Sequence, residues 1–429
     1  MSRPQETSPR PDRRQFVKGA SAAAVAGSLV AATAAQARVH NSVDDTLKVA
    51  LIGCGGRGTG AAVNAVRADE NAKITVLCDA FPDRIEHTKQ VLANQIPNQF
   101  EVADDHCFSG FDGYKQVMAS DVDVVLLCST PAFRPAHLAA AVEAGKHIFC
   151  EKPVAVDSPG VRSVLETSKK AEEKGLCLVS GLCWRYDLGV VETMNRIFDG
   201  AIGEVKAIQE NYLTGTLWHR GNDPKWSQME YQMRNWLYYT WLSGDHIAEQ
   251  HIHSLDKALW LNGDTPPAKC FGLGGRQVRT EEQWGHIYDH FAVCYEWANG
   301  VKAFAYTRQM AGCYNDVDDY VMGTKGSAQI LKNEIVNAEG TWRYKGPSPS
   351  MYDVEHQRLF AAIRSGTPIN NGTYMSYSTL MAIMGREACY TGKSITWDEA
   401  MADQVVLGPT SYEWGDVPTP KVALPGRDA

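Results

Sequence analysis

Apolar and polar residues follow two different patterns along the chain, and the first pattern covers residues 45–183. Short apolar runs are separated by stretches in which Ala, Val and Leu recur at helical spacing. The runs are LKVALI (47–52), AKITVLCDA (72–80), DVDVVLLCST (121–130), KHIFCEKP (146–153) and LCLVSG (176–181). Strands that alternate with helices pair in parallel, so this pattern predicts an α/β domain with a doubly wound, Rossmann-type sheet.

The second pattern is an alternation of apolar and polar residues with period 2, which is typical of strands that bury one face. It is clearest in HFAVCYEWANGVKAFAYTR (290–308), where Asn299-Gly300 interrupts two alternating runs. This pattern predicts an antiparallel hairpin. We therefore expect a second domain over residues 184–429, with the boundary near residue 183.

The N-terminal segment, residues 1–37, follows neither of these two patterns. Arg13 and Arg14 precede a run of 17 mostly small, apolar residues (19–35), which leads into Ala35-Gln36-Ala37. This order is typical of a twin-arginine export signal, predicted here over residues 1–37, with a periplasmic or otherwise exported mature chain. A membrane anchor is the alternative, but the run falls short of the about 20 strongly apolar residues that span a bilayer. No span is expected after cleavage, and export in the folded state favours a bound cofactor.

The amino-acid composition indicates which kinds of molecule the protein can bind. The chain has 429 residues, of which 42 are Lys or Arg and 50 are Asp or Glu. No segment concentrates basic residues, so nucleic-acid binding is not expected and small polar or neutral molecules are favoured. The 11 cysteines are odd in number and lack paired spacing, which argues against a disulfide framework.

A glycine motif follows the first apolar run. Gly53, Gly55 and Gly58 fit G-x-G-x-x-G, in which the glycines allow a tight turn, close approach of a pyrophosphate and close packing of the next helix. Asp79 ends the second strand, 21 positions after Gly58. A carboxylate there binds ribose hydroxyls and repels a 2′-phosphate, so NAD is predicted over NADP. The predicted cofactor-binding residues are Gly53, Gly55, Gly56, Arg57, Gly58, Asp79, Thr130, His137, Glu151 and Lys152.

The segment CEKPVAVD (150–157), after TPAFRPAHLAAAVEAGKHIF (130–149), resembles the glucose-fructose oxidoreductase, inositol dehydrogenase and MocA (Gfo/Idh/MocA) family. The resemblance extends over nearly all of the chain after the signal, through WRYD (184–187), GAIGEVKAI (200–208), YVMGTKGSAQI (320–330) and HQRLFAAIRSGTPINN (356–371). It implies that Lys152 contacts both nicotinamide and substrate, and that the Lys152-Pro153 peptide is cis. It also implies a C-terminal α+β domain with a large open, mainly antiparallel sheet, helices on one face, and a homo-oligomer, dimer or tetramer, formed through the other face.

The resemblance also assigns a catalytic pair to GDHIAEQHIHSLD (244–256), because family members carry an acid and a histidine four residues apart. Here these are Glu249 and His253. On a helix such residues are neighbours, so the carboxylate can orient the imidazole. His253 would then remove a hydroxyl proton while Lys152 stabilises negative charge on the oxygen. The family acid is usually Asp, so Glu249 is a departure.

A metal site is the alternative for the same segment. His246, Glu249 and His253 are spaced i, i+3 and i+7, and His with carboxylate can bind zinc or manganese. No Cys or further His is placed nearby in the sequence to complete a site, and hydride transfer needs no metal, so none is predicted. We expect His246 and His251 at the rim of the cleft.

Residues 213–241 contain four Trp and three Tyr. Their rings either stack on the C–H faces of a sugar or form an aromatic core under a long insertion. The predicted substrate contacts are Arg185, Arg234 and Trp236.

These observations predict an exported NAD(P)-dependent oxidoreductase, NAD-dependent by Asp79, that acts on a sugar, polyol or related cyclic secondary alcohol. Two alternatives stay open. The first is a glycosidase that oxidises, eliminates and reduces with tightly bound NAD, and the second is a sugar-binding protein without catalysis.

Overall fold

The computed structural model describes residues 45–427, so the predicted signal, residues 1–37, lies outside the described residues. The first domain is a six-stranded parallel sheet, sheet A, with strand order β3-β2-β1-β4-β5-β6. Its strands are β1 (Leu47–Ile52), β2 (Ala72–Asp79), β3 (Cys107–Ser109), β4 (Val124–Leu127), β5 (His147–Cys150) and β6 (Leu178–Ser180). The connecting helices are α1 (Gly56–Ala68), α2 (Pro82–Gln95), α3 (Gly113–Ala119), α4 (Arg134–Glu143) and α5 (Ser158–Glu173). The Rossmann prediction is confirmed.

The second domain is built on sheet B, with strand order β14-β13-β12-β11-β7-β10-β9-β8-β15. Its strands are β7 (Val205–Thr214), β8 (Lys269–Gly275), β9 (His290–Glu296), β10 (Lys302–Gln309), β11 (Asp316–Gly323), β12 (Gly326–Gln329), β13 (Glu334–Asn337), β14 (Gly340–Arg343) and β15 (Ile395–Thr396). Only β7 and β10 pair in parallel, so the predicted mainly antiparallel sheet is confirmed. The predicted hairpin joins β9 and β10, with Gly300 at φ 88°.

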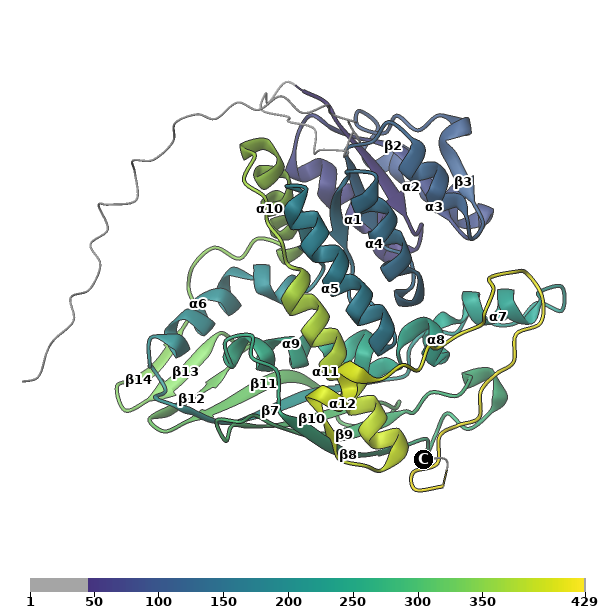
Figure 1. Cartoon of the computed structure of the whole chain (residues 1–429). Coiled ribbons are helices and arrows are strands. Elements are labelled where there is room, and N and C mark those ends of the chain that lie inside the picture. Colours follow the sequence, from purple (N-terminus) through teal and green to yellow (C-terminus); the bar gives the residue numbers. More distant parts are fainter. Residues whose placement is uncertain (1–44, 428–429) are drawn as a thin grey trace, which may run out of the picture. The chain divides into compact units, whose positions relative to one another are not determined.

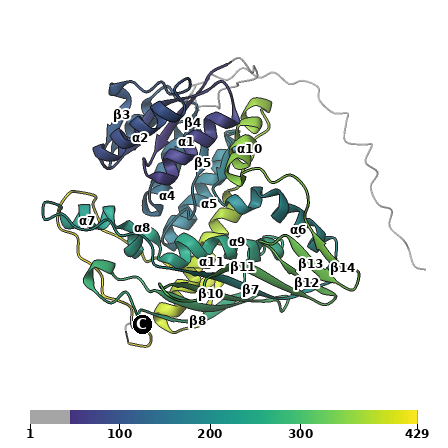
Figure 2. The ribbon, with the colours of Figure 1, turned by 180° about the vertical axis from the view of Figure 1, so that it is seen from behind.

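Helices cover one face of sheet B. They include α6 (Leu188–Phe198), α9 (Ile252–Leu261) and α11 (Gly372–Thr391), and both views show them on the same side of the strands (Figures 1 and 2). The short helices α7 (Gln228–Arg234), α8 (Thr240–Ser243) and α12 (Trp397–Ala402) lie toward one end of the sheet (Figure 1). On the other face, side chains such as Leu273 and Tyr306 are 78% and 40% exposed.

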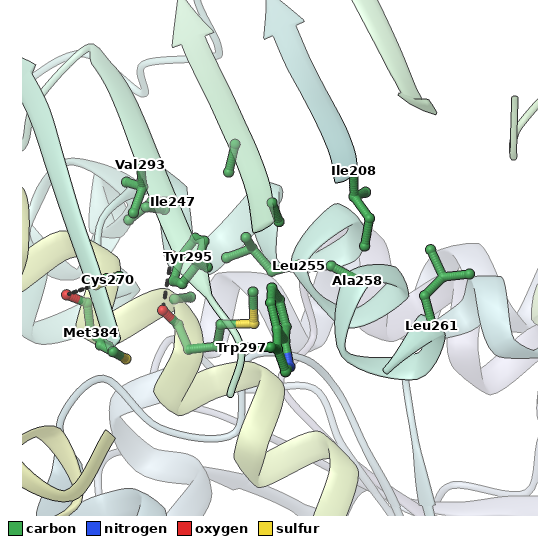
Figure 3. Close-up of a cluster of buried hydrophobic side chains, with 14 of the residues drawn as sticks. Ile208, Ile247, Leu255, Ala258, Leu261, Cys270, Val293, Tyr295, Trp297 and Met384 are labelled. Carbon is green, nitrogen blue, oxygen red and sulfur yellow. Dashed lines mark hydrogen bonds between the residues drawn. The ribbon is translucent and has the colours of Figure 1, made fainter. Parts of the chain in front are cut away.

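The core of this domain lies between sheet B and its helices. Ile208, Val293 and Tyr295 project from the strands toward Leu255 and Ala258 of α9 (Figure 3). The hydroxyl of Tyr295 donates to the carbonyl of Met381 over 3.0 Å, which satisfies the one polar atom of a fully buried ring. This core holds α9 firmly against the sheet.

Helix α10 (Met351–Ser365) belongs by position to the second domain, but it packs on the first. Leu359, Phe360 and Ile363 share a hydrophobic cluster with Val49 and Phe149 of sheet A. The chain after α10 also extends the sheet, because the N–H of Leu178 donates to the carbonyl of Ile369 over 2.7 Å. The predicted division at residue 183 therefore describes the strands of sheet A but misses a helix that returns to them.

Two local features complete the frame of the site. The Lys152-Pro153 peptide is cis, as the resemblance implied. Within residues 45–427, none of the helices is both long enough and apolar enough to cross a membrane.

Candidate active site

A cavity of about 520 Å³ lies at the carboxyl ends of the strands of sheet A and extends to α9. Parallel sheets of this kind bind ligands at that edge. The structure brings all ten predicted cofactor residues to the cavity wall: Gly53, Gly55, Gly56, Arg57, Gly58, Asp79, Thr130, His137, Glu151 and Lys152. Four more predicted residues line the same cavity, namely Glu249, His253, Arg234 and Trp236.

The glycine turn is shaped as a dinucleotide site requires. Gly53 has φ 104°, and a Cβ there would lie 2.4 Å from the carbonyl carbon of Cys128. A Cβ on Gly58 would lie 1.8 Å from the carbonyl oxygen of Gly53. A side chain is therefore excluded at Gly53 and at Gly58, and α1 begins at Gly56. The first N–H groups of a helix lack partners within the helix, so they fit the pyrophosphate of NAD.

Asp79 stands where the ribose of a dinucleotide binds. Its carboxylate accepts the N–H of Cys54 over 2.7 Å and the N–H of Phe81 over 2.9 Å, which fixes its orientation. Burial raises the pKa of Asp79, although these backbone donors oppose the shift. A carboxylate held in this way retains lone pairs for ribose hydroxyls.

Arg57 is held by two carboxylates. Its Nε lies 2.5 Å from Glu151 and its Nη2 2.7 Å from Glu355, and its guanidinium lies over the ring of Tyr352 at 4.6 Å. Burial raises the pKa of Glu151, but the positive charges of Arg57, Lys152 and Arg134 together outweigh burial, so the net pKa is lowered. Arg57 therefore ties the glycine turn to the Glu-Lys-Pro segment and to α10.

Lys152 and Glu249 form an ion pair inside the cavity. Lys152 Nζ lies 3.0 Å from Glu249 Oε1 and also donates to the backbone carbonyl of Glu249. The helix predicted here is not a regular α-helix, because Ile247–His251 form a π-helical turn before α9 begins. Glu249 contacts Lys152, and Nδ1 of His253 has no hydrogen-bond partner among the described residues. The expected orientation of His253 by Glu249 is not what the structure shows.

His253 is suited to accept a proton. The pKa of His253 is well below the usual range, mainly because the side chain is buried and secondly because the positive charge of Lys152 is close. The imidazole is therefore neutral at pH 7. Its place on α9, whose other face packs against sheet B, keeps it beside the ion pair.

The prediction that His246 and His251 lie at the rim is wrong, because both are fully buried. His246 Nδ1 lies 3.0 Å from Asp245, which is also buried, and burial lowers the pKa of His251 to about 3. Within residues 45–427, the structure shows no group of three or more His, Cys, Asp and Glu residues that could hold a metal ion.

Arg185 does not lie on the cavity wall, which corrects its predicted contact with substrate. It pairs with Asp256 over 2.9 Å and with Asp264 over 2.6 Å, so its guanidinium braces the end of α9. Arg234 does line the cavity, but it bonds to Asp83 over 2.9 Å and Glu230 over 2.8 Å. It therefore holds α7 to the Rossmann domain.

Several cavity residues carry no signal in the sequence. Tyr352 and Cys183 reach the cavity from segments about 170 positions apart, and neither residue was predicted, although Cys183 directly precedes WRYD (184–187). Trp218 lies in the aromatic segment, where alternative roles were open, and it packs on Trp236 with ring centroids 5.9 Å apart. The aromatic segment thus supplies part of the wall.

Two family models match the chain. The model described as an oxidoreductase family with an NAD-binding Rossmann fold (GFO_IDH_MocA) matches residues 47–181, and the model of the GFO/IDH/MocA C-terminal domain matches residues 191–329. The chain belongs to the Gfo/Idh/MocA family. It is an NAD-dependent oxidoreductase with the NAD-binding domain of that family.

Curated relatives in the family include inositol 2-dehydrogenases. That of Rhizobium meliloti is 26% identical over 337 residues, which cover 76% of this chain and 91% of the relative. That of Burkholderia cenocepacia is 25% identical over 352 residues, which cover 79% and 92%.

Solved structures share the fold at lower identity. Myo-inositol 2-dehydrogenase from Lactobacillus plantarum has a TM-score of 0.63 at 19% identity, covering 82% of this chain and 99% of that one. A levoglucosan dehydrogenase solved with NADH and levoglucosan has a TM-score of 0.65 at 18% identity, with the same coverage.

Proposed function

We propose that this protein oxidises a secondary alcohol of a sugar, polyol or related cyclic compound with NAD as the hydride acceptor. The observation that carries this proposal is one continuous cavity. It contains the glycine turn and Asp79 as well as the Lys152–Glu249 pair and His253. The names of the relatives, inositol 2-dehydrogenase and levoglucosan dehydrogenase, support the substrate class.

The side chains of the cavity supply the proton chemistry. When bound, NAD accepts the hydride that leaves the carbinol carbon. His253 takes the hydroxyl proton at Nε2, since Nδ1 is enclosed by protein. The ammonium of Lys152 stabilises the negative charge that develops on the substrate oxygen, and Glu249 holds that ammonium in place. Trp218 and Trp236 can pack against the C–H faces of a ring.

The test is a panel of cyclitols, aldoses and anhydrosugars, with NADH formation as the readout. We expect at least one class to reduce NAD with the purified protein, and Lys152→Met to abolish that activity while NAD still binds. Failure of every compound, with NAD bound, would contradict the proposal. Aryl glycosides assayed without added NAD test the glycosidase alternative, because release of the aryl group with no net NADH would favour hydrolysis.

We also propose that the chain is exported by the twin-arginine route and assembles as a homo-oligomer through the open face of sheet B. Arg13 with Arg14 supports export, and the exposed apolar side chains of that face support assembly. Replacing both arginines by lysine should retain the protein in the cytoplasm. Native mass spectrometry should give a dimer or tetramer, and Leu273→Asp should shift it toward monomer.

A further inference from the structure

The last part of the described chain, residues 403–427, crosses from one domain to the other without regular secondary structure. We call it the C-terminal strap. In Figure 1 it is the yellow segment that leaves α12 and runs past α8 to α7. The N–H of Leu407 donates to Asp157 over 2.9 Å, and the N–H of Met229 donates to the carbonyl of Gly415 over 3.0 Å. Gln232, fully buried, donates to the carbonyl of Val417 over 3.1 Å. The strap is therefore anchored along its length.

The strap places two aromatic rings against the cavity wall. The ring of Trp414 lies 4.6 Å from Phe111 and 5.3 Å from Phe81, between centroids. The ring of Tyr412 lies 5.0 Å from Phe133. Phe81, Phe111 and Phe133 all line the cavity, and we call them the phenylalanine wall. Trp414 and Tyr412 stand behind this wall and do not line the cavity themselves.

Two members of the phenylalanine wall, Phe81 and Phe111, belong to the adenosine half of the dinucleotide site. Asp79, which fits the adenosine ribose, ends β2, and Phe81 follows two residues later. Phe111 follows β3, which is the strand beside β2 at the edge of sheet A. Phe133 follows β4, on the other side of β1, and its ring packs on Phe111 with centroids 6.1 Å apart. Lys152 follows β5, one strand beyond β4, so the reacting half lies away from Phe81 and Phe111.

Arg234 of α7 also contacts the phenylalanine wall, at Phe81. The guanidinium of Arg234 lies 4.0 Å from the ring centroid of Phe81 while it pairs with Asp83. The insertion that carries α7 and the strap thus meet at the same phenylalanine. Since the rings of a packed cluster fix one another's positions, removing the outer rings frees the inner ones.

We propose that the C-terminal strap is part of the cofactor site, with Trp414 and Tyr412 as positioning residues that hold the phenylalanine wall against the adenosine of NAD and slow its release. This deepens the proposed function, because it concerns retention of the cofactor and not the reaction. Trp414 and Tyr412 are 46% and 40% exposed, so truncating them removes little from the folded core.

The test compares release of NADH from the full-length protein and its variants, measured by loss of bound-NADH fluorescence on competition with excess NAD. Trp414→Ala with Tyr412→Ala should release NADH about tenfold faster. The rise in melting temperature on adding NADH should shrink with it, while the melting temperature without cofactor changes little. Trp414→Phe and Tyr412→Phe, which keep a ring, should restore slow release.

The matched control is Val406→Ala, which alters an exposed strap residue, 70% exposed. Release within twofold of the wild type in the Ala variants, or equal acceleration by Val406→Ala, overturns the inference. If the double variant does not fold, the single variants decide on the same criteria. A wild-type protein that binds no NADH would instead contradict the proposed function.

Discussion

The two ends of the cavity are made from different side chains and from different kinds of backbone. At the catalytic end, the side chains are charged or polar: Lys152 lies just after β5, and Glu249 and His253 lie on the π-turn and on α9, which packs on sheet B. At the adenosine end, the phenylalanine wall comes from two loops and a short 3-10 turn, and the strap supports it. Catalysis requires charged groups that are held in place by rigid elements, whereas the adenine of NAD can be retained by packing against aromatic rings. Each end should therefore be separable from the other by mutation.

The largest effect is expected at Lys152. Lys152→Met removes the ammonium that stabilises the substrate oxygen, so kcat/KM should fall about a thousandfold. NADH release should change far less than kcat/KM, because Asp79 and the phenylalanine wall at the adenosine end are unaltered. Lys169→Met, on the exposed side of α5, is the matched control. A Lys152→Met enzyme with near-normal kcat/KM would remove Lys152 from the mechanism.

His253 gives the next effect and also a pH dependence. His253→Asn should lower kcat about a hundredfold, in the range of general-base catalysis. Because burial and Lys152 lower the pKa of His253, its neutral form persists as pH falls. Wild-type kcat/KM should therefore show no loss centred near pH 6.5. A loss with that midpoint, absent in the variant, would mean that the imidazole is not shielded as the structure indicates.

Glu249→Gln should have a smaller effect at the same end. It keeps the shape of the side chain but removes the charge paired with Lys152, so kcat should fall about tenfold. The pair is mostly enclosed, with exposed side-chain fractions of 14% for Lys152 and 17% for Glu249. Glu166→Gln, in a surface pair with Lys170 on α5, is the control and should leave kcat unchanged. Equal losses in both variants would argue against a specific role.

The smallest effect is expected at Arg234, on the adenosine side. Arg234→Met breaks the pair with Asp83 and removes the cation from the ring of Phe81. Release of NADH should become about threefold faster, since a half-exposed pair and one ring contact are each weak. The rate of the hydride step in a single turnover should not change. A slowed hydride step with normal NADH release would mean that Arg234 acts at the catalytic end of the cavity and not at the adenosine end.

Five of the six strands of sheet A were predictable because each is a continuous apolar run, and the β9–β10 hairpin because it alternates around Asn299-Gly300. The edge strand β3 was not predicted, because it has three residues and none of them is buried. The glycine turn and Asp79 were predictable because they are local motifs. The burial of His246 and His251 was not, since a polar residue shows its burial only through partners such as Asp245.

Long-range features were also beyond the local patterns. The partners of Arg185 lie 71 and 79 positions away. The strap has no periodicity, so nothing in its pattern indicated that Trp414 would meet Phe81 and Phe111. The π-turn at Glu249 arises within a segment whose spacing matches an ordinary helix.

The return of α10 to sheet A has a consequence for synthesis of the chain. Leu359, Phe360 and Ile363 complete the apolar core around Val49 and Phe149, and the backbone at Ile369 continues the edge of the sheet at Leu178. A ribosome that has completed only residues 45–183 has therefore made every strand of the nucleotide domain but not the helix that closes its core. We therefore expect this domain to complete its core only after α10 has been made, with the apolar surface that α10 covers exposed until then.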